Sequence, residues 1–248
     1  MKALVTGASS GIGKSISLKI LSYGYNLIAV STNKKELDKI YCNYKDKVKC
    51  LEIDLRKREE CFKLYEMVAD DNIDILINNA GVGEYGLFKD TKLNKELDMI
   101  NVNICAYHIL TKLFLNDFIK RNYGRIVNVS SISSFMYGPN MATYYATKSY
   151  ITSLSLAISY ELKKINSNVK ISVFTPGPVK TNFQKKANVK FNIKNITADD
   201  AANNLIKEMF KNKTLIIPNN MKLKKFLIRF IPNNLIMHIN YKIVKKRC

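Results

Sequence analysis

The stretch Thr6-Gly7-Ala8-Ser9-Ser10-Gly11-Ile12-Gly13 decides the fold of this 248-residue chain. It follows a short apolar run and precedes a segment in which apolar residues recur at helical spacing. A glycine-rich turn between a buried strand and a helix is typical of dinucleotide-binding folds. We expect Gly7 to make the sharp exit from the strand and Gly11 to let a pyrophosphate approach the backbone. Gly13 would let the helix pack closely on the sheet.

Apolar runs and helical segments alternate along the rest of the chain. The expected strands are 3–5, 27–30, 48–53, 73–77, 125–129, 169–174 and 215–217. The expected helices are 14–22, 34–44, 57–69, 94–120, 144–163 and 198–211. The strands are near-continuous apolar runs, so both faces of the sheet should be covered. This order predicts an α/β protein with a doubly wound parallel sheet.

Length and composition are consistent with one large domain and a helical extension. Apolar residues make up 47% of the chain, enough to bury a sizeable core. We place the dinucleotide-binding domain at 1–218 and the extension at 219–248. The early glycine turn leaves no room for a secretory signal, and no apolar run is long enough to predict a transmembrane helix.

The cysteines and histidines predict neither disulfides nor a metal site. The five cysteines form no CxxC pair, which predicts free thiols and a cytoplasmic location. The two histidines have no Cys or His at ligand spacing, so no metal is expected. The cysteines are Cys42, Cys50, Cys61, Cys105 and Cys248.

The net charge of +20 has two explanations. It suggests an anionic partner such as nucleic acid, a membrane surface or a phosphorylated ligand. Lys, Asn and Ile are abundant throughout, which favours a general compositional bias instead. Nucleic acid is not expected, because no basic run is long or interleaved with stacking aromatics. The charge is uneven, with no acidic residue from Lys213 onward.

Tyr144 and Lys148 are four residues apart on an expected helix, so they share one face. A phenol has a pKa of about 10, and a nearby ammonium favours the phenolate. Lowering the pKa to ~7 corresponds to roughly 4 kcal/mol and would let Tyr144 exchange a proton with an alcohol or alkoxide. The alternative is a solvent-facing pair, since Tyr and Lys are frequent here.

Other polar residues follow expected strands or interrupt an expected helix. Ser130 and Ser131 follow strand 125–129, at the edge where such sheets bind ligands, and a hydroxyl there can bind a carbonyl oxygen. Asn78-Asn79-Ala80-Gly81 follows strand 73–77, where amides can bridge the backbone and a cofactor. Asn103 lies inside an expected helix, where Asn is disfavoured. Its amide can hold a water, or it can lie on a solvated face.

The end of the second expected strand bears on the choice of cofactor. Ser31-Thr32-Asn33-Lys34-Lys35 contains no acid, whereas an acid there would bind the ribose 2′-hydroxyl and repel a 2′-phosphate. Hydroxyl and amide donors followed by two lysines favour NADP, with NAD as the alternative. The two lysines can equally be a solvated helix start.

These motifs, together with Pro176-Gly177, occur in the order and spacing of the classical short-chain dehydrogenases/reductases, which the chain resembles over about residues 2–218. Ser131 precedes Tyr144 by thirteen positions, as in that family. The resemblance implies a Rossmann-type sheet of about seven strands. It also implies a homo-oligomeric oxidoreductase that transfers hydride between NAD(P)H and a carbonyl or alcohol substrate.

The resemblance also implies a role for each matching residue. Tyr144 would be the general acid/base, and Lys148 would lower its pKa and hold the nicotinamide ribose. Ser131 would polarise the substrate carbonyl, and Asn103 would anchor the water of a proton relay. Thr32 departs from the Arg that NADP-preferring members often carry. The implied cofactor-binding residues are Gly7, Ser9, Ser10, Gly11, Ile12, Gly13, Thr32, Asp54, Leu55, Asn79, Ala80, Gly81, Tyr144, Lys148, Val179 and Thr181.

The substrate pocket is expected to be apolar, because Tyr137, Met141, Phe183 and the stretch 178–196 would line it. An apolar carbonyl compound is therefore the expected substrate. The rival function is a non-catalytic dinucleotide-binding sensor or scaffold on the same fold. Intact Ser131, Tyr144 and Lys148 argue against this rival.

The extension carries two basic amphipathic helical patterns separated by Pro232. In the first, apolar residues recur at helical spacing with basic residues largely opposite. One interpretation is an anchor on an anionic membrane surface. The other is a pair of helices covering the substrate cleft or a subunit interface, and periodicity alone does not separate the two. The apolar residues are Leu223, Phe226, Leu227, Phe230 and Ile231, followed by Ile236, Ile239 and Ile243.

Overall fold

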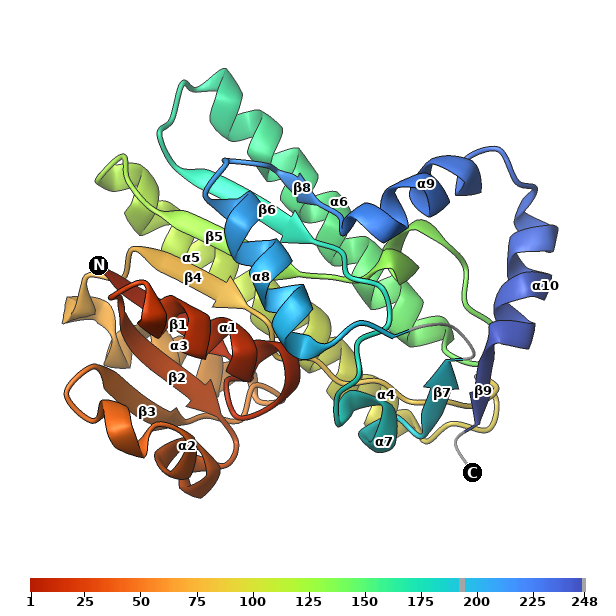
Figure 1. Cartoon of the computed structure of the whole chain (residues 1–248), viewed down its shortest axis with the longest axis horizontal. Helices are drawn as coiled ribbons and strands as arrows, with labels where there is room; N and C mark the ends of the chain where they lie inside the picture. The colour runs from red at the N-terminus through yellow and green to blue at the C-terminus, as the bar shows by residue number, and fades with distance from the viewer. Residues whose placement is uncertain (192–194, 247–248) are drawn as a thin grey trace.

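The computed structural model describes residues 1–191 and 195–246 (Figure 1). Within these residues, seven parallel strands form one sheet in the order β3-β2-β1-β4-β5-β6-β8. The predicted doubly wound parallel sheet is therefore confirmed. The chain order reverses between β1 and β4, which is where such sheets bind ligands. The strands are β1 (Lys2–Thr6), β2 (Asn26–Ser31), β3 (Val48–Glu52), β4 (Ile75–Asn78), β5 (Arg125–Val129), β6 (Lys170–Phe174) and β8 (Leu215–Ile216).

Helices cover both faces of this sheet, because successive strand residues point to opposite sides and both sides are apolar. Ala3 and Val5 of β1 belong to a core cluster with α1 and α8, whereas Leu4 belongs to a second cluster with α3 and α5. The helices around the sheet are α1 (Gly11–Ser22), α2 (Lys34–Ile40), α3 (Arg58–Met67), α4 (Leu93–Ile100), α5 (Ala106–Lys120), α6 (Ala142–Lys164) and α8 (Ala198–Met209).

The expected helix 94–120 is interrupted. Between α4 and α5, the π-helix η3 (Asn101–Cys105) places Asn103 at its centre. A π-turn keeps the chain helical while shifting its backbone bonds to i→i+5, so apolar periodicity does not reveal it. Short 3₁₀ turns also follow α2, α3 and β5 as η1 (Cys42–Tyr44), η2 (Ala69–Asp71) and η4 (Ile132–Phe135).

A second small sheet, which the sequence did not predict, ties the extension to the main domain. β7 (Val189–Phe191) pairs antiparallel with β9 (Val244–Lys246), after the short helix α7 (Phe183–Lys186). Figure 1 shows α9 (Asn219–Ile228) and α10 (Asn233–Ile243) at one side of the sheet, with the chain returning to β7.

The extension packs on the main domain through a third core cluster. Ile228, Ile236 and Val244 are buried there together with Ile132 and Met141. The extension and the domain before it therefore share apolar packing, and the proposed boundary after residue 218 stays a prediction.

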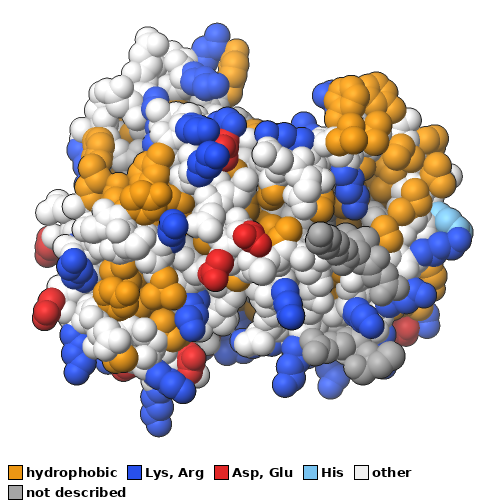
Figure 2. Space-filling view, viewed as in Figure 1, with side chains coloured by type: hydrophobic (Ala, Val, Ile, Leu, Met, Phe, Trp, Pro, Cys, Tyr) orange, Lys and Arg blue, Asp and Glu red, His pale blue; other side chains and the backbone are white. Residues whose placement is uncertain are grey.

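Helix α9 presents its predicted apolar face outward. Leu223, Phe226 and Phe230 are 68%, 57% and 72% exposed, whereas Met221 and Ile228 face the third cluster. Figure 2 shows apolar side chains gathered over α9 and α10, with basic side chains beside them. The predicted amphipathic helices are present, but α9 packs on the domain through a different face.

Among the described cysteines, Cys42, Cys50, Cys61 and Cys105 are free, and Cys248 lies outside the described residues. Arg247 of the basic extension and residues 192–194 of the expected pocket stretch also lie outside them. No helix among residues 1–191 and 195–246 is both long and apolar enough to cross a membrane.

Candidate active site

A cleft of about 600 Å³ lies at the carboxyl ends of the strands. Of the predicted site residues, all but Gly13 and Asn103 line it. Those two lie directly behind the lining, where they support it. The lining members are Gly7, Ser9, Ser10, Gly11, Ile12, Thr32, Asp54, Leu55, Asn79, Ala80, Gly81, Ser131, Tyr144, Lys148, Val179 and Thr181.

The turn between β1 and α1 has the shape that a pyrophosphate requires. Gly7 has a φ of 69°, which side chains disfavour. A Cβ on Gly13 would lie 2.3 Å from the Gly7 carbonyl oxygen, so only glycine lets α1 approach this closely. Ser10 precedes α1 and its side chain forms no capping bond, which leaves the first N–H groups of the helix available for an anion. The residues therefore fit a dinucleotide cofactor.

The end of β2 carries hydroxyl and amide groups in place of a carboxylate. Ser31 and Ser9 share a hydrogen bond of 2.7 Å between their hydroxyls. The side-chain oxygen of Asn33 accepts from the Glu36 N–H at 3.0 Å and so caps α2. Asn33 therefore has a structural role, which leaves Ser31 and Thr32 as the side chains that reach the cleft.

Asp54 lies in the same part of the cleft and is held by Arg56. Their side chains pair at 2.7 Å, and the guanidinium holds the pKa of Asp54 below its usual range. A carboxylate paired in this way keeps its negative charge and a fixed orientation.

Asn79 ties the end of β4 to the end of β1. Its side-chain amide donates to the Thr6 carbonyl oxygen, and its backbone N–H donates to the Thr6 hydroxyl, both at 2.9 Å. Through these bonds, the two strands on either side of the chain reversal hold the cleft floor in one position.

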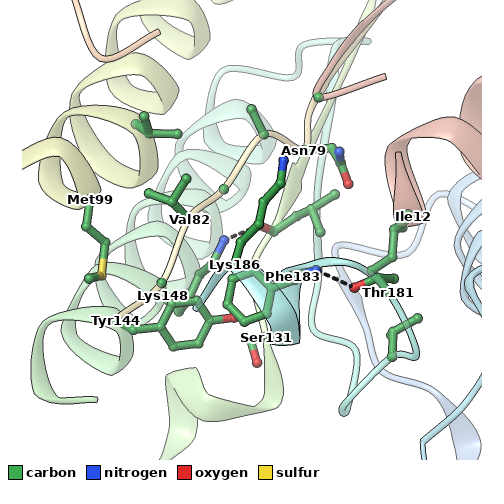
Figure 3. A pocket seen from close by; sticks show the side chains of 18 of the residues that line it. Ile12, Asn79, Val82, Met99, Ser131, Tyr144, Lys148, Thr181, Phe183 and Lys186 are labelled. Carbon is green, nitrogen blue, oxygen red and sulfur yellow. Dashed lines mark hydrogen bonds between the residues drawn. The ribbon is translucent and has the colours of Figure 1, made fainter. Parts of the chain in front are cut away.

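Tyr144, Ser131 and Lys148 meet on one wall of the cleft (Figure 3). The hydroxyls of Tyr144 and Ser131 point toward one another. The Lys148 ammonium lies 5.9 Å from the centre of the Tyr144 ring and donates to the Val129 carbonyl oxygen at 3.0 Å. The helical spacing and the strand-end position therefore bring together the three side chains that the sequence singled out.

The pKa of Tyr144 differs from the expectation. Burial raises it to about 12, although the hydrogen bond with Ser131 acts in the opposite direction. Burial also lowers the pKa of Lys148 to about 8. The expected fall of the Tyr144 pKa toward 7 is wrong for this structure, because desolvation of the phenol outweighs its hydrogen bond with Ser131. The phenol is therefore protonated at neutral pH.

Asn103 is fully buried behind the cleft, and its side chain is occupied. It donates to the Val82 carbonyl oxygen at 2.9 Å and to the Thr147 hydroxyl at 3.1 Å. It also accepts from the Val82 N–H at 3.0 Å. The amide thus fixes the segment after Gly81 against α6, and the alternative of a solvated helix face is wrong.

The substrate side of the cleft is mainly apolar, but its members differ in part from the prediction. Phe183 lines it, with its ring centre 5.3 Å from that of Tyr144. Tyr137 and Met141 do not line it, because Tyr137 faces outward and Met141 is buried in the third cluster. Phe191, from the expected stretch 178–196, also lines it, and the members that the sequence missed are Met136, Tyr145, Lys224, Asn240 and Ile243.

Comparison with known proteins identifies the family. Residues 1–191 match the sequence model of the family described as short chain dehydrogenase. The chain belongs to this family. It is 31% identical over 191 residues to the 3-oxoacyl-[acyl-carrier-protein] reductase FabG of Rickettsia prowazekii, which covers 76% of each chain. The enzyme of the same name from Haemophilus influenzae is 29% identical over 199 residues, 77% of this chain and 81% of the relative.

Solved structures share the fold. A short-chain dehydrogenase from Sphingobium yanoikuyae in complex with NADPH superposes with a TM-score of 0.83 at 24% identity, covering 93% of this chain and 96% of that one. A short-chain dehydrogenase/reductase from Burkholderia phymatum in complex with NAD gives 0.83 at 20% identity, covering 92% and 91%. As a member of the short-chain dehydrogenase family, the protein is an NAD(P)-dependent oxidoreductase that acts on a small-molecule carbonyl or alcohol, as predicted.

Proposed function

We propose that the protein is an NADPH-dependent carbonyl reductase in which Tyr144 is the general acid. The observation that carries this proposal is the meeting of Tyr144, Ser131 and Lys148 in a cleft whose other end is the glycine turn of β1 and α1. Such a cleft can hold a dinucleotide and a carbonyl compound side by side.

In this proposal the bound cofactor supplies the hydride, and the protein supplies the proton and the orientation. Ser131 donates a hydrogen bond to the substrate carbonyl oxygen. Tyr144, which is protonated at neutral pH because its pKa lies well above 7, gives its proton to the oxygen as negative charge develops there. Lys148, held by the Val129 carbonyl oxygen, adds positive charge beside the phenol and would hold the nicotinamide ribose of the bound cofactor. At the π-turn around Asn103, the backbone hydrogen bonds depart from the α-helical i→i+4 pattern. Backbone groups released there can hold the water of the proton relay.

NADPH is proposed over NADH because the end of β2 has no carboxylate to repel a 2′-phosphate. Ser31 and Thr32 offer hydroxyls there, and Lys34 begins α2 beside them. Comparing the Kd of NADPH and NADH by fluorescence titration tests this choice. Tighter binding of NADH would overturn it.

The proposed substrate is an apolar carbonyl compound. Met136, Phe183 and Phe191 line the side of the cleft beyond Tyr144. The Rickettsia relative is named for a 3-oxoacyl substrate, whose chain would suit such a wall. Lys224, Asn240 and Ile243 also line the cleft and lie beyond the matched residues 1–191, so the present substrate is expected to differ from that of the relative.

Replacing Tyr144 with phenylalanine tests the enzymatic function against the rival sensor or scaffold. NADPH consumption with a panel of steroid, acyl and short ketones should fall to background in Tyr144→Phe, while NADPH still binds. Tyr150→Phe is the matched control, since Tyr150 lies on the same helix but lines no part of the cleft, and this variant should keep its activity. Absence of turnover by the wild-type protein with every ketone and alcohol would favour the sensor. Turnover confined to small charged ketones would contradict an apolar substrate.

We also propose a homo-oligomer in the cytoplasm whose extension contacts an anionic membrane surface. The exposed side chains Leu223, Phe226 and Phe230 form an apolar face beside basic residues. Flotation with phosphatidylserine vesicles should recover the wild-type protein but not a Phe226→Ser/Phe230→Ser variant. Equal recovery of both would end the membrane proposal, and sedimentation equilibrium tests the oligomer.

A further inference from the structure

Lys224 lies on the face of α9 that packs against the domain. Met221, three residues before it, packs against the third cluster, and Ile228, four residues after it, is buried there. Residues at this spacing share one face of a helix, so the Lys224 side chain points inward. It lines the cleft.

The acids that line the cleft are already paired with other cations. Asp54 pairs with Arg56 at 2.7 Å, and Asp98 lies 3.8 Å from the same guanidinium. Glu84 pairs with Lys95 at 3.1 Å.

The Lys224 ammonium forms no hydrogen bond or ion pair within residues 1–191 and 195–246. Burial lowers the pKa of this ammonium, as expected for a cation that has lost water without gaining a partner.

The surroundings of Lys224 differ from those of the other lysines in the cleft. Lys148 belongs to the catalytic wall, and Lys186 is exposed and extends toward Asn79 near the cofactor turn (Figure 3). Lys224 instead shares its side of the cleft with apolar side chains. Met136, Tyr145 and Phe191 line the cleft and belong to the third cluster, against which this face of α9 packs. A partly desolvated cation on an apolar wall favours a ligand that brings an anion to it.

We propose that Lys224 binds an anionic group, a carboxylate or a phosphate, carried by the apolar carbonyl substrate away from its reacting carbon. This inference rests on the proposed reductase activity and names the class of its substrate. The substrate is amphiphilic, with an apolar body along Phe183 and Phe191 and one negative charge at Lys224. Lys224 is then a specificity-determining residue supplied by the extension.

Matched substrates test the proposal. Straight-chain ketones ending in a carboxylate, their methyl esters and the corresponding phosphate monoesters would be reduced by wild-type protein and by Lys224→Met. A hydrogen bond to a charged group is worth enough that the KM of the preferred anion should rise roughly 10- to 100-fold in Lys224→Met. The methyl ester should be unaffected, and the larger effect among the two anions identifies the natural group.

Controls separate this role from folding and from general charge. Lys222→Met removes a charge from the exposed side of the same helix and should leave every KM unchanged. Lys224→Arg should restore most of the preference for the anion. Equal effects of Lys224→Met on acid and ester, or no effect on either, would overturn the proposal.

A binding measurement keeps the inference testable if the wild-type protein reduces none of these ketones, a result that counts against the proposed reductase alone. Calorimetric titration of the NADPH-loaded protein with each carboxylate and phosphate would then decide. Weaker binding of one of these anions to Lys224→Met than to wild type supports the inference. Equal binding, or no binding to wild type, refutes it.

Discussion

Replacing Asn103 with alanine is expected to destabilise the fold around the cleft, although Asn103 lines no part of it. The side chain satisfies both the N–H and the carbonyl of Val82 in a fully buried position. Thr147 keeps a second partner, because its hydroxyl also donates to the Tyr144 carbonyl oxygen. Two orphaned backbone groups at about 1–3 kcal/mol each give a loss of roughly 2–5 kcal/mol, since water entering the new space recovers part of the cost.

Calorimetric melting measures this loss. For a chain of this size, each kcal/mol corresponds to about 2–4 °C, so the Tm of Asn103→Ala should fall by roughly 4–20 °C. Asn101→Ala is the control, because Asn101 lies in the same π-turn and its side chain makes no hydrogen bond within the described residues. A Tm for Asn103→Ala within about 1 °C of wild type would refute the assignment of Asn103 as the support of this wall.

Three further predictions follow from the site geometry. Gly13→Ala places a Cβ 2.3 Å from the Gly7 carbonyl oxygen, so it should cost about 1–3 kcal/mol in denaturant unfolding and weaken NADPH binding in a fluorescence titration. Lys148 has a pKa of about 8 instead of 10.5, so between these pH values the unfolded state binds the extra proton and stability rises with pH. The free energy of unfolding should rise by roughly 3 kcal/mol across this pH range, and denaturation curves of Lys148→Met should lack this rise. Phe183→Ala opens space beside Tyr144 and should raise the KM of a small apolar ketone roughly 10-fold more than that of a bulky one.

The central sheet and the cofactor turn could be predicted because their signals are local. Buried parallel strands are continuous apolar runs, and β5 has the bounds that its run of apolar residues predicted. Gly7 and Gly13 stand at fixed distances from the strand and helix that they join. Tyr144 and Lys148 share a helix face because of their spacing. Ser131 follows a strand of the same sheet, so its position beside them could be inferred from the strand order.

The rest depends on contacts between residues far apart in the chain. The pairing of Val189–Phe191 with Val244–Lys246 involves three residues on each side, too few for a recognisable alternation. Helix α9 has apolar residues on both faces, so periodicity did not say that Met221 and Ile228 would be the buried ones. The raised pKa of Tyr144 comes from burial. A lysine four residues away in the sequence gives no information on how deeply the phenol is buried.

The β7–β9 pair brings the end of the chain to the substrate side of the cleft, far along the sequence from the glycine turn of β1 and α1. Most of the residues that would hold the dinucleotide lie within residues 7–81 and the last of them is Thr181, whereas one wall of the substrate side requires Asn240 and Ile243 and the strand that follows them. During synthesis, the chain can therefore form its nucleotide-binding half before its selectivity exists. Replacement of this C-terminal segment during evolution can therefore change the substrate specificity while Tyr144 continues to deliver the proton.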